Sequence, residues 1–137
     1  MTEFGTVEVG LELAPLTVRL TRETLVRYAG ASGDFNPIHY NDTAAATLGL
    51  PGVIVHGMLT MGTALRVVTD WCGDPARVQG YYVRFTKPVV VPAAEGVDVT
   101  FAGTITAVAD GVATVSIEAT CEDAKVLGSA TAEVRLG

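Results

Sequence analysis

The sequence predicts an α+β fold in which one antiparallel sheet wraps around a single long helix. The second half of the chain alternates apolar and polar residues in strand-like runs separated by tight turns. One stretch of the first half is helical in period and apolar on most sides, so it is the candidate to cover the sheet. With 137 residues the chain fits one domain, to which we assign residues 1–137.

The N-terminal elements are short. Alternating apolar residues predict an extended segment that ends near residue 20. Thr21 can cap a helix over about 22–31, and a second helix is expected over about 42–48. Between these helices Pro37 breaks regular structure, because the residue before a proline is held out of the helical region.

The long helix is predicted over residues 58–71. Its apolar residues recur at three- and four-residue steps, at Met58, Met61, Leu65, Val68 and Trp71. The other faces carry few strongly polar side chains, so we expect a helix that is buried on most sides.

The rest of the chain predicts the sheet. A strand is expected over about 77–86, and three alternating stretches follow up to the C-terminus. Asp110 and Gly111 are typical of a two-residue hairpin, and a further turn is expected at Glu122 and Asp123. At least four strands joined by hairpins after one long helix form the hot-dog arrangement.

Composition excludes several classes of protein. The formal net charge is −6 and no run of Lys or Arg occurs, which argues against nucleic-acid binding. We expect no signal peptide, and no apolar stretch approaches the roughly 18 residues of a membrane span. Cys72 and Cys121 have no metal-type spacing, and two free thiols predict a cytoplasmic protein. A mean hydropathy of +0.39 suggests apolar surface covered by a partner subunit.

The segment from Gly33 to His39 is the candidate site of chemistry. Within it a carboxylate, an amide and an imidazole follow one another closely, as Asp34, Asn36 and His39. A carboxylate and an imidazole that share one water can position it, and either can take or give its proton. Asp before Asn-Pro can also form only a turn, and His39 can be purely structural. These residues alone leave both interpretations open.

The start of the long helix offers a second feature. The first N–H groups of a helix have no partner within it, so they can bind an oxygen that gains negative charge. His56 and Gly57 lie directly before this helix, where such donors are expected. His56 can equally be a packed or capping residue.

Two strings resemble one known family. Residues 28–42, YAGASGDFNPIHYND, resemble the signature of the MaoC-like, R-specific enoyl-thioester hydratases and dehydratases, in which an aromatic residue and a small stretch precede G-D-x-N-P-aliphatic-H. Residues 55–62, VHGMLTMG, resemble the family's entry into the hot-dog helix. The resemblance covers nearly the whole chain and is strongest to the catalytic B-type subunit of the (3R)-hydroxyacyl-acyl-carrier-protein dehydratases of type II fatty acid synthase.

The resemblance implies a role for each matching residue. Asp34 and His39 would hold the reacting water, with the division of acid and base between them left open. Asn36 would support this pair by hydrogen bonding, and Gly57 would face the thioester. Some family members bind the thioester carbonyl through a Ser-Gly pair further along the helix, and the matching positions here are Leu65 and Arg66. At Arg66 a backbone donor remains, whereas the serine hydroxyl is absent.

We therefore expect a hydro-lyase that interconverts (3R)-3-hydroxyacyl thioesters and trans-2-enoyl thioesters. A dehydratase of fatty acid synthesis is the first hypothesis. An (R)-specific enoyl-CoA hydratase of fatty acid degradation or polyester precursor supply is the second. A hot-dog thioesterase and a non-catalytic acyl-binding subunit are the alternatives from other classes.

The same resemblance indicates what the protein binds. We expect no cofactor, because coenzyme A or acyl carrier protein is part of the substrate. We expect no metal, because Asp34, His39 and His56 lack an H-x-x-x-H or paired-cysteine spacing. Hot-dog proteins pair, so we expect a homodimer or a heterodimer with another hot-dog subunit, with this chain as the catalytic partner.

Overall fold

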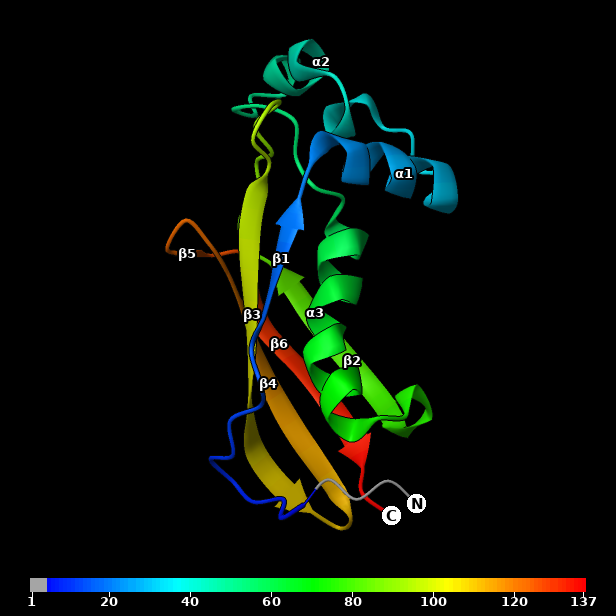
Figure 1. Ribbon diagram of the computed structural model, residues 1–137, viewed down its shortest axis with the longest axis vertical. Coiled ribbons are helices and arrows are strands. Elements are labelled where there is room, and N and C mark those ends of the chain that lie inside the picture. The colour runs from blue at the N-terminus through cyan, green and yellow to red at the C-terminus, as the bar shows by residue number, and fades with distance from the viewer. Residues whose placement is uncertain (1–4) are drawn as a thin grey trace.

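An antiparallel sheet curves around one face of a long helix in the computed structural model, which confirms the predicted hot-dog architecture (Figure 1). The structure describes residues 5–137, so the first four residues of the predicted domain lie outside the described residues. The strand order is β1-β3-β4-β6-β2, with β5 paired to β4. The strands are β1 (Leu16–Leu20), β2 (Val78–Phe85), β3 (Val97–Ala109), β4 (Val112–Cys121), β5 (Ala124–Lys125) and β6 (Leu127–Arg135).

The helices divide into one that packs on the sheet and two that lie beyond its end. The long helix α3 (Gly57–Cys72) runs along the concave face of the sheet, whereas α1 (Arg22–Ser32) and α2 (Asp42–Thr47) gather at one end of it (Figure 1). Single-turn 3-10 helices form at Pro37–His39 and Pro75–Arg77. In the described part of the chain, no helix has the length and apolar character needed to cross a membrane.

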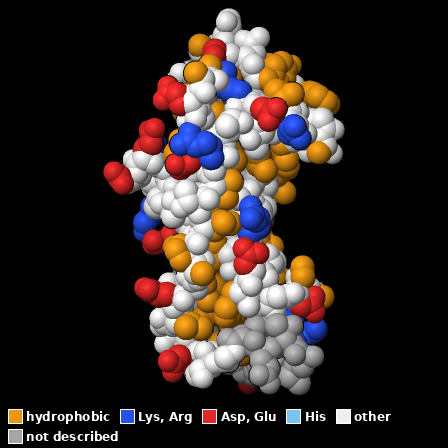
Figure 2. All heavy atoms as spheres, viewed as in Figure 1, with side chains coloured by type: hydrophobic (Ala, Val, Ile, Leu, Met, Phe, Trp, Pro, Cys, Tyr) orange, Lys and Arg blue, Asp and Glu red, His pale blue; other side chains and the backbone are white. Residues whose placement is uncertain are grey.

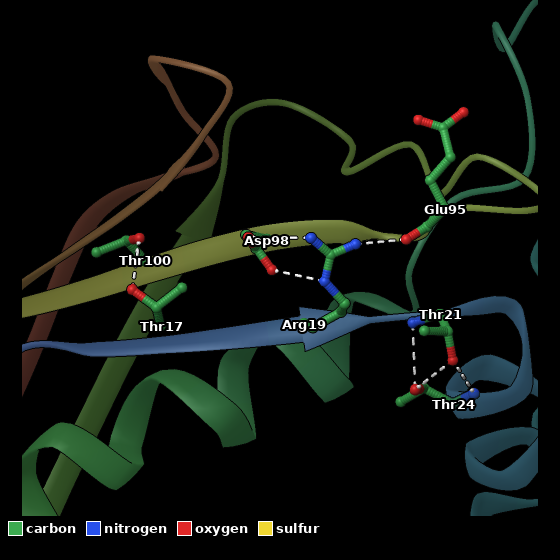
Figure 3. A network of polar contacts seen from close by, with 7 residues as sticks. All are labelled: Thr17, Arg19, Thr21, Thr24, Glu95, Asp98 and Thr100. Carbon is green, nitrogen blue, oxygen red and sulfur yellow. Dashed lines mark hydrogen bonds and ion pairs between the residues drawn. The ribbon is translucent and has the colours of Figure 1, made fainter.

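The junction of β1 and α1 follows the predicted capping. The Thr21 hydroxyl accepts a hydrogen bond from the backbone N–H of Thr24, and the Thr24 hydroxyl accepts one from the backbone N–H of Thr21 (Figure 3). Arg19 on β1 pairs with Asp98 on β3 at 3.1 Å and donates to the carbonyl of Glu95. These contacts fix the point at which the chain leaves the sheet toward the end where α1 and α2 lie.

The predicted hairpins form, with one difference in strand order. Asp110 and Gly111 both have positive φ, 53° and 76°, as a two-residue turn between β3 and β4 requires. The expectation that hairpins join all the strands after the long helix is wrong for β2, which pairs with β6 rather than with the next strand, β3. Residues 86–96 cross the end of the sheet instead, where Val90 pairs with Ile54.

The predicted inner face of α3 is partly wrong. The side chains that α3 buries are mostly small, at Thr60, Ala64, Val67, Val68 and Cys72. Small side chains let the helix approach closely, because a Cβ atom on Gly103 of β3 would lie 3.0 Å from Val67. Of the larger apolar residues predicted to face inward, Met58 is 63% exposed, and Met61, Leu65 and Trp71 are half-buried. Hydrophobic side chains are visible in the region of α3 in Figure 2, so this helix is not covered on most sides within one chain.

Candidate active site

The segment after α1 is shaped by its own side chains. Gly33 ends α1 in the left-handed conformation, at φ 77°. The Asp34 carboxylate then accepts from the backbone N–H of Asn36 at 3.2 Å, and the Asn36 side-chain oxygen accepts from the N–H of Ile38, also at 3.2 Å. Two successive side-chain turns thus lead into the 3-10 turn that carries His39. Asn36 therefore supports the fold of the segment through the backbone of Ile38.

The structure brings Asp34 and His39 together. Oδ2 of Asp34 lies 3.8 Å from Nε2 of His39, and the Asp34 side chain is about half exposed whereas that of His39 is 8% exposed. Nδ1 of His39 lies 2.8 Å from the carbonyl oxygen of Ile54. Because a carbonyl can only accept, Nδ1 is the donor of this bond, and the neutral form of the ring would present a lone pair on Nε2 beside the carboxylate. A water between Asp34 and this nitrogen would have two acceptors.

His56 contacts both members of this pair. Its ring stacks on His39 with centroids 3.8 Å apart and planes inclined by 20°, and the edge of Tyr28 contacts it. Nε2 of His56 donates to the backbone carbonyl of Asp34 at 3.1 Å. Only 1% of His56 is exposed, and this burial is the main cause that lowers the pKa of His56 below its ordinary value. His56 is therefore a packed, neutral imidazole that does not cap α3 through its side chain.

The same three residues form the one cluster with metal-ligating atoms in the described part of the chain. Donor atoms of Asp34, His39 and His56 lie within 4.8 Å of one another. A ligating imidazole must hold the ion in the plane of its ring, and two nearly parallel planes 3.8 Å apart meet only far from both rings. The stacking therefore opposes joint ligation, and the absence of a bound metal stays a prediction.

Gly57 begins α3 beside this cluster. Among the hydrogen bonds of residues 5–137, none is donated by the backbone N–H of Gly57 or Met58, so both remain available. The Phe85 ring packs directly on Gly57, where a Cβ atom would lie 3.2 Å from Cζ of that ring. Arg66 is exposed in the middle of α3, and the structure does not bring it to the site.

A pocket of about 290 Å³ connects these groups to the surface. His39 lies at its buried end, and Gly57 and Thr60 of α3 form one side. The opposite side comes from residues far along the chain, namely Phe85, Thr86, Lys87, Pro88, Val89 and Val126. The sequence did not predict this side of the pocket, because no local pattern indicates that residues 39 and 126 line the same pocket. Thr60 could have been predicted as a pocket residue, because it is a polar residue within an apolar helical stretch.

Comparison with known proteins adds a family to this geometry. Residues 8–123 match the family described as MaoC like domain. The chain is 44% identical over 79 residues to 3-hydroxyacyl-thioester dehydratase X of Mycobacterium tuberculosis, a match that covers 58% of this chain and 27% of that protein. It is 32% identical over 109 residues to the 3-oxo-4,17-pregnadiene-20-carboxyl-CoA hydratase beta subunit of the same organism, covering 80% and 81%.

Solved structures of similar proteins superpose on nearly the whole of this chain. A MaoC-like dehydratase superposes with a TM-score of 0.94 at 43% identity, covering 98% of this chain and 42% of that one. A chain of the ChsH1-ChsH2 complex from Mycobacterium tuberculosis superposes with a TM-score of 0.83 at 27% identity, covering 96% and 100%. Our chain thus spans well under two thirds of some relatives and the full length of others.

Burial of His56 predicts how stability depends on pH. The unfolded chain takes up a proton on this residue near pH 6.5, whereas the folded chain does so only at a lower pH. The free energy of unfolding should therefore fall as the pH drops below 6.5, until the folded chain also takes up the proton on His56.

Urea unfolding at about pH 7.5 and about pH 5.5 measures this effect. His56→Phe keeps a ring and removes the titration, so its stability should change less between the two pH values than that of the wild type. Equal changes in both proteins would contradict the prediction.

Proposed function

The chain belongs to the MaoC-like domain family, and we propose that it is a hydro-lyase interconverting (3R)-3-hydroxyacyl thioesters and trans-2-enoyl thioesters. The observation that carries this proposal is the 3.8 Å approach of Asp34 Oδ2 to Nε2 of His39, a buried residue that lines a pocket. The similarity to a named 3-hydroxyacyl-thioester dehydratase and a named CoA-thioester hydratase subunit supports the same reaction.

The geometry suggests how the proton moves during hydration. A water held by the Asp34 carboxylate gives one proton to Nε2 of His39 while its oxygen bonds to C3 of the enoyl group. The His39 imidazolium then gives that proton to C2, which restores the neutral ring. Asp34 stays ionised, orients the water and stabilises the imidazolium in between. Dehydration follows the same path in reverse, so one pair of residues serves both directions.

The negative charge that develops on the thioester oxygen needs donors. The backbone N–H groups of Gly57 and Met58 are available at the N-terminus of α3, where the helix dipole also favours negative charge. Gly57 lines the pocket together with His39, so one bound thioester can reach both. We therefore assign the carbonyl-binding role to the start of α3 rather than to Arg66.

Asp34→Asn and His39→Ala should each lower the rate of hydration by about 10²- to 10⁴-fold, the range expected for general acid–base groups. The loss of ultraviolet absorbance of trans-2-enoyl-coenzyme A measures hydration. Asp98→Asn, which removes an exposed carboxylate that does not line the pocket, should stay active. Release of free thiol from a saturated acyl thioester would instead favour a thioesterase. A wild-type protein that binds the thioester without turnover would favour an acyl-binding subunit.

Gly57→Ala tests the carbonyl site. The added methyl group meets the Phe85 ring at 3.2 Å and displaces it over the helix N-terminus, so kcat/KM should fall about tenfold. Gly62→Ala is the matched control, because a Cβ atom at Gly62 of the same helix meets nothing within 4 Å. The control should keep full activity and be slightly more stable, since alanine favours helix. Equal kcat/KM for the two variants would contradict this assignment.

The carrier and the pathway remain hypotheses. We propose an acyl-carrier-protein substrate of fatty acid synthesis first and a coenzyme A substrate second. Turnover of one acyl chain on both carriers decides between them, and a strong preference for coenzyme A excludes the first. The cytoplasmic location stays a prediction, which the two unpaired buried cysteines support.

We further propose that the chain works as a dimer, with itself or with a second hot-dog subunit. Strand β2 lies at an edge of the sheet and exposes Tyr82 and Phe85, and α3 leaves Met58 uncovered. A similar chain occurs in the ChsH1-ChsH2 complex. Sedimentation equilibrium of the purified chain should give twice its mass of 14.2 kDa for a homodimer, or the summed mass of both subunits after a hot-dog partner is added. A fully active monomer would contradict the proposal.

A further inference from the structure

One cation lies at the open end of the catalytic pocket. Lys87 is exposed and lines the same pocket as the buried His39. It follows β2 in the chain, two residues beyond Phe85, the ring that covers Gly57. The lining of this pocket thus includes both the buried His39 and the exposed, positively charged Lys87.

Several cations of this acidic protein pair with carboxylates, and Lys87 does not. Four of the other eight Lys and Arg residues form such pairs, namely Arg19–Asp98, Arg22–Asp42, Arg27–Glu23 and Lys125–Glu118. No ion pair of Lys87 occurs within residues 5–137. Burial raises the pKa of the nearby Cys121 thiol and Glu122 raises it further, whereas the positive charge of Lys87 opposes this shift.

Glu122 is the nearest competing charge at this rim. Lys87 and Glu122 both line a second hollow of about 110 Å³, beside Cys121. The two side chains do not pair, so the ammonium of Lys87 remains free for an anion that arrives through the pocket.

We propose that Lys87 binds the phosphate that ends the pantetheine arm of the substrate. This inference rests on the proposed function. The arm and the acyl chain carry no charge near the thioester, so the phosphate is the first anionic group that a cation at the rim can meet. That phosphate is common to acyl carrier protein and coenzyme A. A pocket of about 290 Å³ is at the small end for ligand sites, and it suits a linear arm better than a nucleotide.

The proposal assigns a direction to the bound substrate. The thioester lies at Gly57 beside Asp34 and His39, and the arm passes Phe85 and Val89 toward Lys87. Arg84 on β2 is also exposed and close in sequence, but it does not line the pocket. Arg84 is therefore the natural control for a general effect of positive charge.

The test compares trans-2-enoyl thioesters of pantetheine, 4′-phosphopantetheine, coenzyme A and acyl carrier protein. Lys87→Gln should lower kcat/KM about three- to fivefold for the three substrates that carry the phosphate, the upper part of the range expected for an exposed ion pair. It should leave the pantetheine thioester within about twofold of wild type. Glu122→Gln should raise kcat/KM for the phosphorylated substrates, and Arg84→Gln should change neither class.

Each other outcome has a definite meaning. If Lys87→Gln lowers kcat/KM equally for all four thioesters, or for none, the phosphate site is wrong while the hydro-lyase stands. An equal effect of Arg84→Gln would show a general attraction and would also overturn the site. If the wild type hydrates no thioester at all, the proposed function fails first, and loss of enoyl absorbance separates that case. Within the coenzyme A and carrier-protein arms, a Lys87 effect on only one identifies the source of the phosphate.

Discussion

The stack of His39 on His56 is the contact on which the candidate site depends. A single buried ring supports both reacting groups, because it packs against the imidazole of His39 and donates to the carbonyl of Asp34. His56 is itself held by its neighbours, since Val53 and Val55 exchange backbone hydrogen bonds with Val91 and Val89 across the end of the sheet. Backbone hydrogen bonds thus hold the segment that carries His56, and the His56 ring in turn supports Asp34 and His39.

This arrangement also orients both imidazoles. The carbonyl oxygens of Ile54 and Asp34 each accept a hydrogen bond from one ring, from Nδ1 of His39 and from Nε2 of His56. Burial lowers the pKa of His56 and so disfavours a positive charge there, which would oppose the imidazolium that the proposed mechanism forms at His39. The half-exposed carboxylate of Asp34 lies 3.8 Å from His39, where it would stabilise that imidazolium.

Sequence reasoning succeeded where structure is local and failed where it is not. The segment from Gly33 to His39 folds through bonds between residues two apart, so its pattern was enough to bring Asp34 and His39 together. The predicted inner face of α3 is partly wrong, because a helix that is apolar on most sides has no unique inner side in its sequence. The close approach to Gly103 requires small residues on the side of α3 that packs on the sheet. Phe85 and Lys87 reach the pocket by a crossover of the sheet, which no periodicity reveals.

An acidic protein that takes an anionic carrier needs its attraction to act at short range. The net charge of −6 repels such a carrier at a distance, but salt screens charges beyond about 8 Å under physiological conditions. Within that distance the pocket presents Lys87, which has no ion pair within the described residues. An anionic group that reaches the pocket would therefore meet an ammonium that no carboxylate neutralises. On this proposal one pocket serves two purposes, because Lys87 would bind the anionic phosphate whereas Asp34 and His39 would hold the water.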